Sequence, residues 1–458
     1  MEMELAISLT VRIDESGANL NEICAAIQES IRGELAVCVA EEVIEGFQEN
    51  LRDRLCTPSC QEAGAKALGS HRQKEDPERD CEGRKLIKQG YRSSPRKVKT
   101  DIGELSFCVG YVQCVECGKK WAPIMDLLEI RPKSKHTTGL ERVASEAVMK
   151  TSYKRGEEDI EGRGAAPVPR SSAHRWVAQR ELPASEIKHI ETGMADGTGF
   201  KKWPGQRGNL RIVIGFEKDK KVRPMGIWAG KSWEDIGKEI RKRMREEDKD
   251  QDVMQMKLFT QDGEVGLDAH LASLAERGQR CIWHLPRDLG YTMWRDEAPL
   301  PERKEMSAQL ASLVGIEIPE EDWETIQPQD RESLKGKVAG SEKEIQQMID
   351  QFRAKGYSKA ANYLENACGQ IFAHVHLWLE TGIVAPRTTS ILENIIRELG
   401  RRVKKLGWNW SDEGAEQMAK MVMLRRFDRE LWEKYWQQEL GLNGRCKIEI
   451  KEIRRCAA

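Results

Sequence analysis

The chain has 458 residues and a formal net charge of -1, with 33% charged and 39% hydrophobic residues. This length exceeds what one hydrophobic core usually supports, so we expect two or three domains. The composition excludes a largely disordered chain, and the small net charge means that a nucleic-acid surface would have to come from local basic clusters.

The N-terminal segment, Met1 to Ile13, alternates apolar and polar residues and carries acids, which favours a strand over a signal peptide. No apolar run approaches membrane-spanning length. Twelve unevenly spaced cysteines indicate a reducing compartment in which thiols stay reduced or bind metal. We therefore expect a cytoplasmic protein that has no membrane partner.

Apolar residues recur at helical spacing from Asn19 to about Leu55 and predict a long amphipathic helix with an interruption near Gly33. The polar stretch that follows, residues 56–99, reads as an exposed connection with a basic end. That end is either a solvated surface or an arm that contacts phosphates.

Short strands are expected over residues 99–130, around the sequence Cys114-x-x-Cys117-Gly118. Such a turn can present two thiolates to a tetrahedral Zn²⁺ ion, because the glycine permits a tight backbone. The alternative is a pair of buried thiols in a small β unit. Spacing alone does not choose the further zinc ligands, for which the candidates are Cys56, Cys60, Cys81, Cys108 and His71.

Three short helices are predicted next, over residues 138–152, 154–162 and 171–180, the last capped by Ser171. His174, Arg175, Gln179 and Arg180 would project from the last helix, as in a helix-turn-helix reader of DNA. Short polar helices also occur in ordinary linkers. Arg175 and Arg180 are the candidate DNA contacts.

The following segment predicts three strands, then helix, strand, helix and strand, an order typical of an RNase H-like α/β domain. The expected strands are Ile187–Ala195, Leu210–Glu217, Arg223–Ala229, Met256–Thr260 and Arg280–Leu285, and the expected helices are Ser232–Arg245 and Leu267–Arg277.

In that arrangement Asp196 and Asp262 would lie on neighbouring strands, close enough to share a divalent metal ion. Taken singly, each is by default a turn aspartate. Glu393 opens a long predicted helix on which Arg397, Arg401 and Lys404 follow at intervals of three or four, although an ordinary ion-paired surface helix would read the same way.

Four motifs in one order carry a resemblance: Asp196-Gly197-Thr198, Asp262-Gly263, Cys281-x-x-His284 and Ser390-Ile391-Leu392-Glu393. Together they resemble the DDE transposases of prokaryotic insertion sequences, in the Mutator-like group. The Asp101-Ile102-Gly103-Glu104-Leu105 segment leading to Cys114-x-x-Cys117 is similar to the N-terminal region of some of these enzymes. The resemblance covers roughly residues 95–415.

The resemblance implies metal ligation and catalysis by Asp196, Asp262 and Glu393, with Mg²⁺ or Mn²⁺, two ions in all. It implies cleavage and strand transfer of DNA, with terminal inverted repeats and target DNA as partners and a dimer or larger oligomer on the DNA. Cys281 and His284 form a signature pair near the site, which we expect to pack beside it from a strand.

The 131-residue spacing from Asp262 to Glu393 is too long for a minimal RNase H-like core, and residues 298–382 show helical periodicity. The resemblance implies an all-α insertion here, in which Trp323 and Trp378 either pack in the core or stack on an unpaired base. Trp408, Trp410, Trp432 and Trp436 mark a helical C-terminal region.

The expected organisation is therefore an α/β RNase H-like catalytic domain with an all-α insertion, preceded by a mixed N-terminal region. Two alternatives stay open: a domesticated DNA-binding protein with an inactive scaffold, and a non-transposing nuclease or resolvase. The expected boundaries are 1–98 for the first strand, long helix and basic segment, 99–136 for the β unit, 137–185 for the helical DNA-binding unit, 186–297 for the first part of the core, 298–387 for the insertion and 388–458 for the last helix and C-terminal region.

Overall fold

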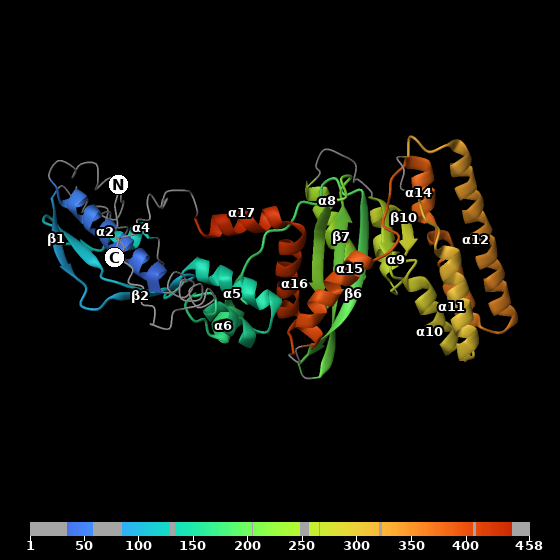
Figure 1. Ribbon diagram of the computed structural model, residues 1–458, viewed down its shortest axis with the longest axis horizontal. Coiled ribbons are helices and arrows are strands. Elements are labelled where there is room, and N and C mark those ends of the chain that lie inside the picture. The colour runs from blue at the N-terminus through green and yellow to red at the C-terminus, as the bar shows by residue number, and fades with distance from the viewer. Residues whose placement is uncertain are drawn as a thin grey trace, which may run out of the picture. The chain divides into compact units, whose positions relative to one another are not determined.

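The computed structural model describes residues 34–57, 85–128, 133–203, 205–247, 256–264, 266–319, 323–405 and 409–441. These residues form two compact units, coloured along the chain in Figure 1. Unit 1 takes in the described residues up to Gln179 and those from Glu439 onward, and unit 2 spans Arg180–Gln438. Within the described part of the chain, no helix is both long and apolar enough to cross a membrane. The predicted strand at Met1 to Ile13 lies outside the described residues.

Unit 1 begins with helix α2 (Ala36–Cys56), which confirms the described part of the predicted long helix. The helix packs its apolar side, including Val37, Ile44 and Phe47, against a small apolar core. Two sheets and a short helix complete this part. Strands β2 (Arg96–Thr100) and β3 (Gly103–Phe107) form a hairpin. The other sheet has the order β1-β4-β5, with β1 (Leu86–Tyr91), β4 (Gly110–Cys114) and β5 (Lys120–Trp121), and helix α4 (Pro123–Leu127) follows it.

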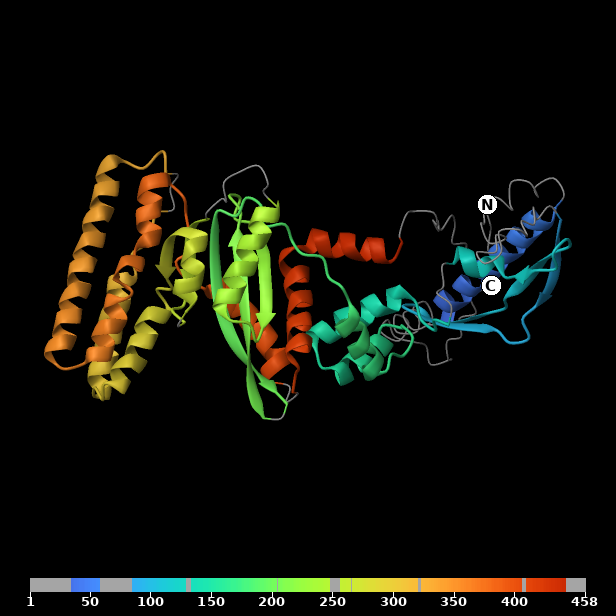
Figure 2. The ribbon, with the colours of Figure 1, turned by 180° about the vertical axis from the view of Figure 1, so that it is seen from behind.

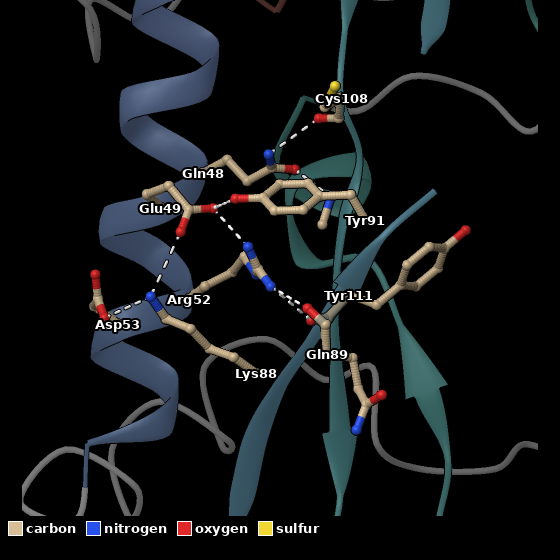
Figure 3. Close-up of polar contacts among 10 residues, drawn as sticks. Gln48, Glu49, Arg52, Asp53, Lys88, Gln89, Tyr91, Cys108 and Tyr111 are labelled. Carbon is tan, nitrogen blue, oxygen red and sulfur yellow. Dashed lines mark hydrogen bonds and ion pairs between the residues drawn. The ribbon is translucent and has the colours of Figure 1, made fainter. Parts of the chain in front are cut away.

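A polar network fastens α2 to this sheet (Figure 3). The Arg52 guanidinium is almost fully buried, donates to the Glu49 carboxylate at 2.6 Å and to the Gln89 carbonyl, and lies 4.6 Å from the centre of the Tyr91 ring. The buried Gln48 amide donates to the Cys108 carbonyl at 3.0 Å. These bonds pair the buried Gln48 amide and the terminal nitrogens of Arg52, so they fix how the helix lies on the strands.

Helices α5 (Thr138–Lys150), α6 (Tyr153–Glu161) and α7 (Arg170–Gln179) confirm the three predicted short helices. The link between α6 and α7, residues 162–169, is longer than the three- or four-residue turn of a helix-turn-helix. The prediction that Ser171 caps the last helix is wrong, because α7 begins at Arg170 and the Pro169 carbonyl accepts from the backbone of Ser172.

Unit 2 is built on a five-stranded sheet in the order β10-β9-β6-β7-β8. Strand β7 runs antiparallel to both β6 and β8, whereas β9 runs parallel to β6 and β10 runs parallel to β9. The strands are β6 (Thr192–Lys202), β7 (Gln206–Phe216), β8 (Val222–Ala229), β9 (Met256–Gln261) and β10 (Ala275–Arg280).

Helices cover both faces of the sheet (Figures 1 and 2). Helices α8 (Trp233–Glu247) and α9 (Leu267–Leu271) pack on one face, against side chains that include Ala195 and Val213. The opposite face, to which the intervening residues of each strand point, contacts α15 (Ser390–Gly400) and α16 (Asp412–Phe427). Ser232 caps α8 as predicted, accepting from the Asp235 backbone at 3.1 Å.

Two predictions in this region are wrong. The helix expected over Leu267–Arg277 stops at Leu271, continues as the 3-10 turn η3 (Ala272–Leu274) and gives way to β10. The strand expected at Arg280–Leu285 is therefore displaced, and a helix, α10 (His284–Arg295), begins where the strand was predicted to end. The helical spacing of three leucines led to this prediction. They are buried in the core of the sheet and anchor the short connection from α9 to β10: Leu267, Leu271 and Leu274.

Between β10 and α15 the chain is helical, in agreement with the predicted helical periodicity. Its core joins α10 to the later helices through residues such as Leu289, Phe352 and Trp378. Trp378 is buried, and Trp323 packs at the edge of the same core, so both are packing residues. The helices are α11 (Leu300–Val314), α12 (Pro328–Ala354), α13 (Ser358–Glu365), the 3-10 turn η4 (Cys368–Gln370) and α14 (Ala373–Thr381).

After α15 a π-helical turn, η5 (Arg401–Lys405), precedes α16 and α17 (Arg429–Glu439). Ser411 caps α16, accepting from the Gly414 backbone at 3.0 Å. Trp432 and Trp436 are fully buried, in agreement with a compact helical C-terminal region, whereas Trp408 and residues 445–455 lie outside the described residues.

Replacing Arg52 by alanine should lower the free energy of unfolding of unit 1 by about 2–3 kcal/mol, because a buried charged donor and its hydrogen bonds are lost together. Lys88→Ala is the matched control: Lys88 also pairs with Glu49, but 36% of its side chain is exposed, so a loss below about 1 kcal/mol is expected. Urea denaturation of both variants measures the difference, and equal losses would contradict the role given to Arg52.

Candidate active site

The pairing register of the sheet brings Asp196 and Asp262 together. Ala195 pairs with Gln261 across the parallel strands β6 and β9, so the next residue on each strand is an aspartate. Residues in register on adjacent strands point to the same face. Asp196 is buried within β6, not in a turn, which corrects the prediction that its strand ends at Ala195; Asp262 directly follows β9.

Glu393 reaches the same place from α15, which covers that face of the sheet. It lies in the first turn of the helix, where its backbone N–H donates to the Thr389 carbonyl at 3.0 Å. Its carboxylate contacts His284 Nε2 at 3.2 Å and remains 27% exposed. Asp262 and Glu393, which are 131 residues apart in the sequence, thus both act electrostatically on Asp196.

The pKa of Asp196 is raised to about 7, first by burial and then by the negative charge of Asp262, with smaller contributions from Glu393 and Glu264. The pKa of Asp262 is also raised, mainly by burial, and the nearby Arg280 opposes this shift. Burial and like charges both disfavour the ionised carboxylate. Burial is thus the largest cause of both shifts, and the neighbouring carboxylates add to it at Asp196.

Cys281 and His284 connect the end of β10 to the start of the Glu393 helix. The Thr389 backbone N–H donates to Cys281 Sγ at 3.4 Å, and the Thr389 hydroxyl lies 3.3 Å from His284 Nδ1. Because a carboxylate can only accept, His284 Nε2 must carry the proton that faces Glu393. Burial lowers the pKa of His284, so it serves as a neutral donor at neutral pH. The pair holds Glu393 in position from a loop and a helix start, not from the predicted strand.

Each aspartate is followed by a glycine for a specific reason. A Cβ atom on Gly263, which has φ +95°, would collide with the Arg280 guanidinium. A Cβ atom on Gly197 would lie 3.0 Å from a Glu264 carboxylate oxygen. The two glycines thus make room for the Arg280 guanidinium and the Glu264 carboxylate beside the aspartates. This role was not predicted from the sequence.

Glu264 is a further acid at this site that sequence reasoning missed. It acts on both aspartates, and its carboxylate accepts from Arg211 at 2.9 Å. The only sequence signal for Glu264 as a site residue is its position two residues after Asp262. In the structure its backbone N–H donates to Asp262 Oδ1 at 2.8 Å.

The predicted basic residues differ in their positions. Three of them are exposed on or just after α15: Arg397, Arg401 and Lys404. Partial burial lowers the pKa of Lys404, and the nearby charge of Asp196 opposes this shift. Arg175 is exposed on α7. Arg180 does not project from that helix, which ends at Gln179; instead it lies over the Trp436 ring at 4.5 Å and donates to the Tyr435 hydroxyl.

Among the described residues, no three His, Cys, Asp or Glu side chains lie close enough together to hold a metal ion as they stand. Glu393 faces His284, and the Asp262 carboxylate accepts from the Glu264 backbone. Cys114 is buried at the end of β4 beside Leu55 and Leu86, and Cys117 is exposed in the turn that follows, while Cys60, His71 and Cys81 lie outside the described residues.

No protein-family model matches the sequence, and no curated protein matches it significantly.

The raised pKa of Asp196 predicts how the metal-free protein responds to pH. The folded state holds the Asp196 proton up to about pH 7, whereas the unfolded chain releases it near the ordinary value of 3.8. The free energy of unfolding should therefore fall as the pH rises from about 4 to about 7, by at most about 4 kcal/mol.

Asp196→Asn should remove most of this dependence and be more stable than the wild type at pH 8, but not at pH 4. Urea denaturation in the presence of a chelator measures both. Glu276→Gln, an exposed acid on the same sheet that pairs with Lys257, should leave the pH dependence unchanged. An Asn variant that is less stable than the wild type at pH 8 would show that ionising Asp196 does not destabilise the fold, which would contradict its raised pKa.

Proposed function

We propose that this protein is a DDE-type DNA transposase that cleaves and joins DNA strands with Asp196, Asp262 and Glu393. One observation supports this most: Asp196 and Asp262 each follow the paired residues Ala195 and Gln261 of two adjacent parallel strands, and a helical glutamate 131 residues later also acts on Asp196. Few structural roles require buried acids to converge, because each raises the cost of ionising the next.

We propose that unit 2 has an RNase H-like core. The strand order β10-β9-β6-β7-β8, with only β7 antiparallel to its neighbours, and helices on both faces support this assignment. The helices α11 to α14 would then be the insertion between the second aspartate and the glutamate.

The carboxylates suit Mg²⁺ or Mn²⁺, since hard oxygen ligands are those that these ions prefer. Asp196, Asp262 and Glu393 would hold the ions, and a bound pair would activate the attacking oxygen and stabilise the leaving one. The pKa of about 7 at Asp196 fits such a site, because a bound cation would stabilise the ionised carboxylate that burial and the neighbouring acids disfavour. His284 would orient Glu393 and keep its carboxylate ready for ligation.

The exposed basic residues after Glu393 would contact the DNA backbone. Arg397, Arg401 and Lys404 follow the acid along one helical stretch, and phosphate binding by such residues supplies affinity without sequence preference. Arg175 on α7 is the corresponding candidate in unit 1. Arg180 is left out of this proposal, since its guanidinium packs on Trp436.

A second candidate is a DNA-binding protein in which this core is an inactive scaffold. Two observations favour it: Glu393 contacts His284, and the described residues include no group of three His, Cys, Asp or Glu side chains arranged to hold a metal ion. The two functions differ in whether Asp262 is needed for chemistry or only for folding.

DNA cleavage distinguishes them. A labelled duplex carrying the DNA that flanks the gene, with its terminal repeats, should be cut in Mg²⁺ or Mn²⁺ and not in chelator. Asp262→Asn should lower the rate by at least about 100-fold, because a metal ligand at the reacting phosphate is lost. Glu276→Gln, which removes an exposed carboxylate from the same sheet, should cut at the wild-type rate.

Cleavage that persists in chelator, or that Asp262→Asn leaves unchanged, would overturn the proposed chemistry. Metal-independent binding of the same duplex with no cleavage by the wild type would favour the inactive scaffold.

A further inference from the structure

An aromatic and basic face runs along α10, directly beside the candidate active site. Trp283, Arg287, Tyr291 and Trp294 are all exposed, the aromatic side chains by 57% to 62%. Their spacing of four, four and three residues puts them on one side of a helix. The opposite side of α10 packs into the helical core through Leu285, Leu289 and Met293.

This face begins at the carboxylates. Trp283 precedes His284, whose ring lies 5.1 Å from the Trp283 ring and whose Nε2 contacts Glu393. The Arg287 guanidinium lies 5.5 Å from the same Trp283 ring and feels the charges of Glu393 and Asp262. At 1.5 Å per residue, the face extends about 16 Å away from the site.

Three exposed aromatic side chains in a row are costly in water and need a reason. Aromatic rings that alternate with a guanidinium match a nucleic-acid strand, since rings stack on bases of any sequence and the cation pairs with a phosphate. A duplex buries the faces of its bases, so only unpaired nucleotides can use the rings. The Arg287 guanidinium is 45% exposed and also pairs with the neighbouring Asp288 carboxylate at 2.7 Å, so a phosphate would share this cation with an acid. An apolar protein partner would have no use for either charge.

We propose that the α10 face, formed by Trp283, Arg287, Tyr291 and Trp294, binds unpaired nucleotides next to the DNA bond that the carboxylates cleave. The inference rests on the proposed function, and names the form of DNA that this site holds. At about 3.4 Å per stacked nucleotide, 16 Å corresponds to four or five nucleotides of a single strand.

Fluorescence anisotropy with a labelled twelve-nucleotide oligothymidine and with a duplex of equal length tests the face, in chelator so that no cleavage is involved. Trp283→Ala and Trp294→Ala should each weaken binding of the single strand by about tenfold and leave duplex binding nearly unchanged. Trp283→Phe keeps a ring and should retain most of the affinity.

The matched control is Trp203→Ala, which removes a tryptophan that is 76% exposed at the end of β6, away from this helix. It should bind the single strand like the wild type. Wild-type affinity in both α10 alanine variants, or equal losses for single strand and duplex, would overturn the proposal. So would a change in self-association, followed by sedimentation, without a change in DNA binding.

Because the assay needs no metal, its outcome is independent of cleavage. If Asp262→Asn leaves cleavage unchanged but the alanine variants still lose single-strand binding, the proposed chemistry fails and the α10 face stands. If cleavage behaves as proposed but single-strand binding does not depend on α10, only this inference fails.

Discussion

The burial of the Asp196 carboxylate beside other acids is the constraint on which the rest of the candidate site depends. The register of two parallel strands makes Asp196 and Asp262 neighbours, and burial makes their shared charge costly, so the pKa of Asp196 rises to about 7. A fold selected for stability alone would place apolar residues at these positions, as it does at Ala195 and Val213 on the other face. We infer that the acids are kept for a cation and the chemistry that it allows.

Much of the surrounding structure serves to hold these acids where they are. Gly197 and Gly263 leave room for Glu264 and Arg280, so that each charge can approach an aspartate without a steric clash. Cys281, His284 and Thr389 tie the end of β10 to the start of α15. The same loop starts α10, which links the position of Glu393 to the aromatic face and to the helical core beyond it.

The sequence predicted the order of strands and helices in the sheet of unit 2, because apolar runs and helix starts are local patterns. The catalytic role of the three acids, which rests on the resemblance, stays a prediction. Sequence patterns placed Arg180 on the wrong element, and Cys281 and His284 on a strand, because the ends of short elements are decided by tertiary contacts such as stacking on Trp436. The only sequence signal for Glu264 is its position two residues after Asp262, and the contacts of Thr389 with Cys281 and His284 appear only in the folded chain. The zinc prediction at Cys114 and Cys117 stays a prediction.

The most direct test of a shared metal site is Mn²⁺ binding, followed by electron paramagnetic resonance of the free ion. We expect saturable binding that strengthens between pH 5 and pH 8, as Asp196 gives up its proton, and at least about tenfold weaker binding in Asp196→Asn, Asp262→Asn and Glu393→Gln. Equal affinity in the wild type and all three variants would contradict the account, because the acids would then not form one site.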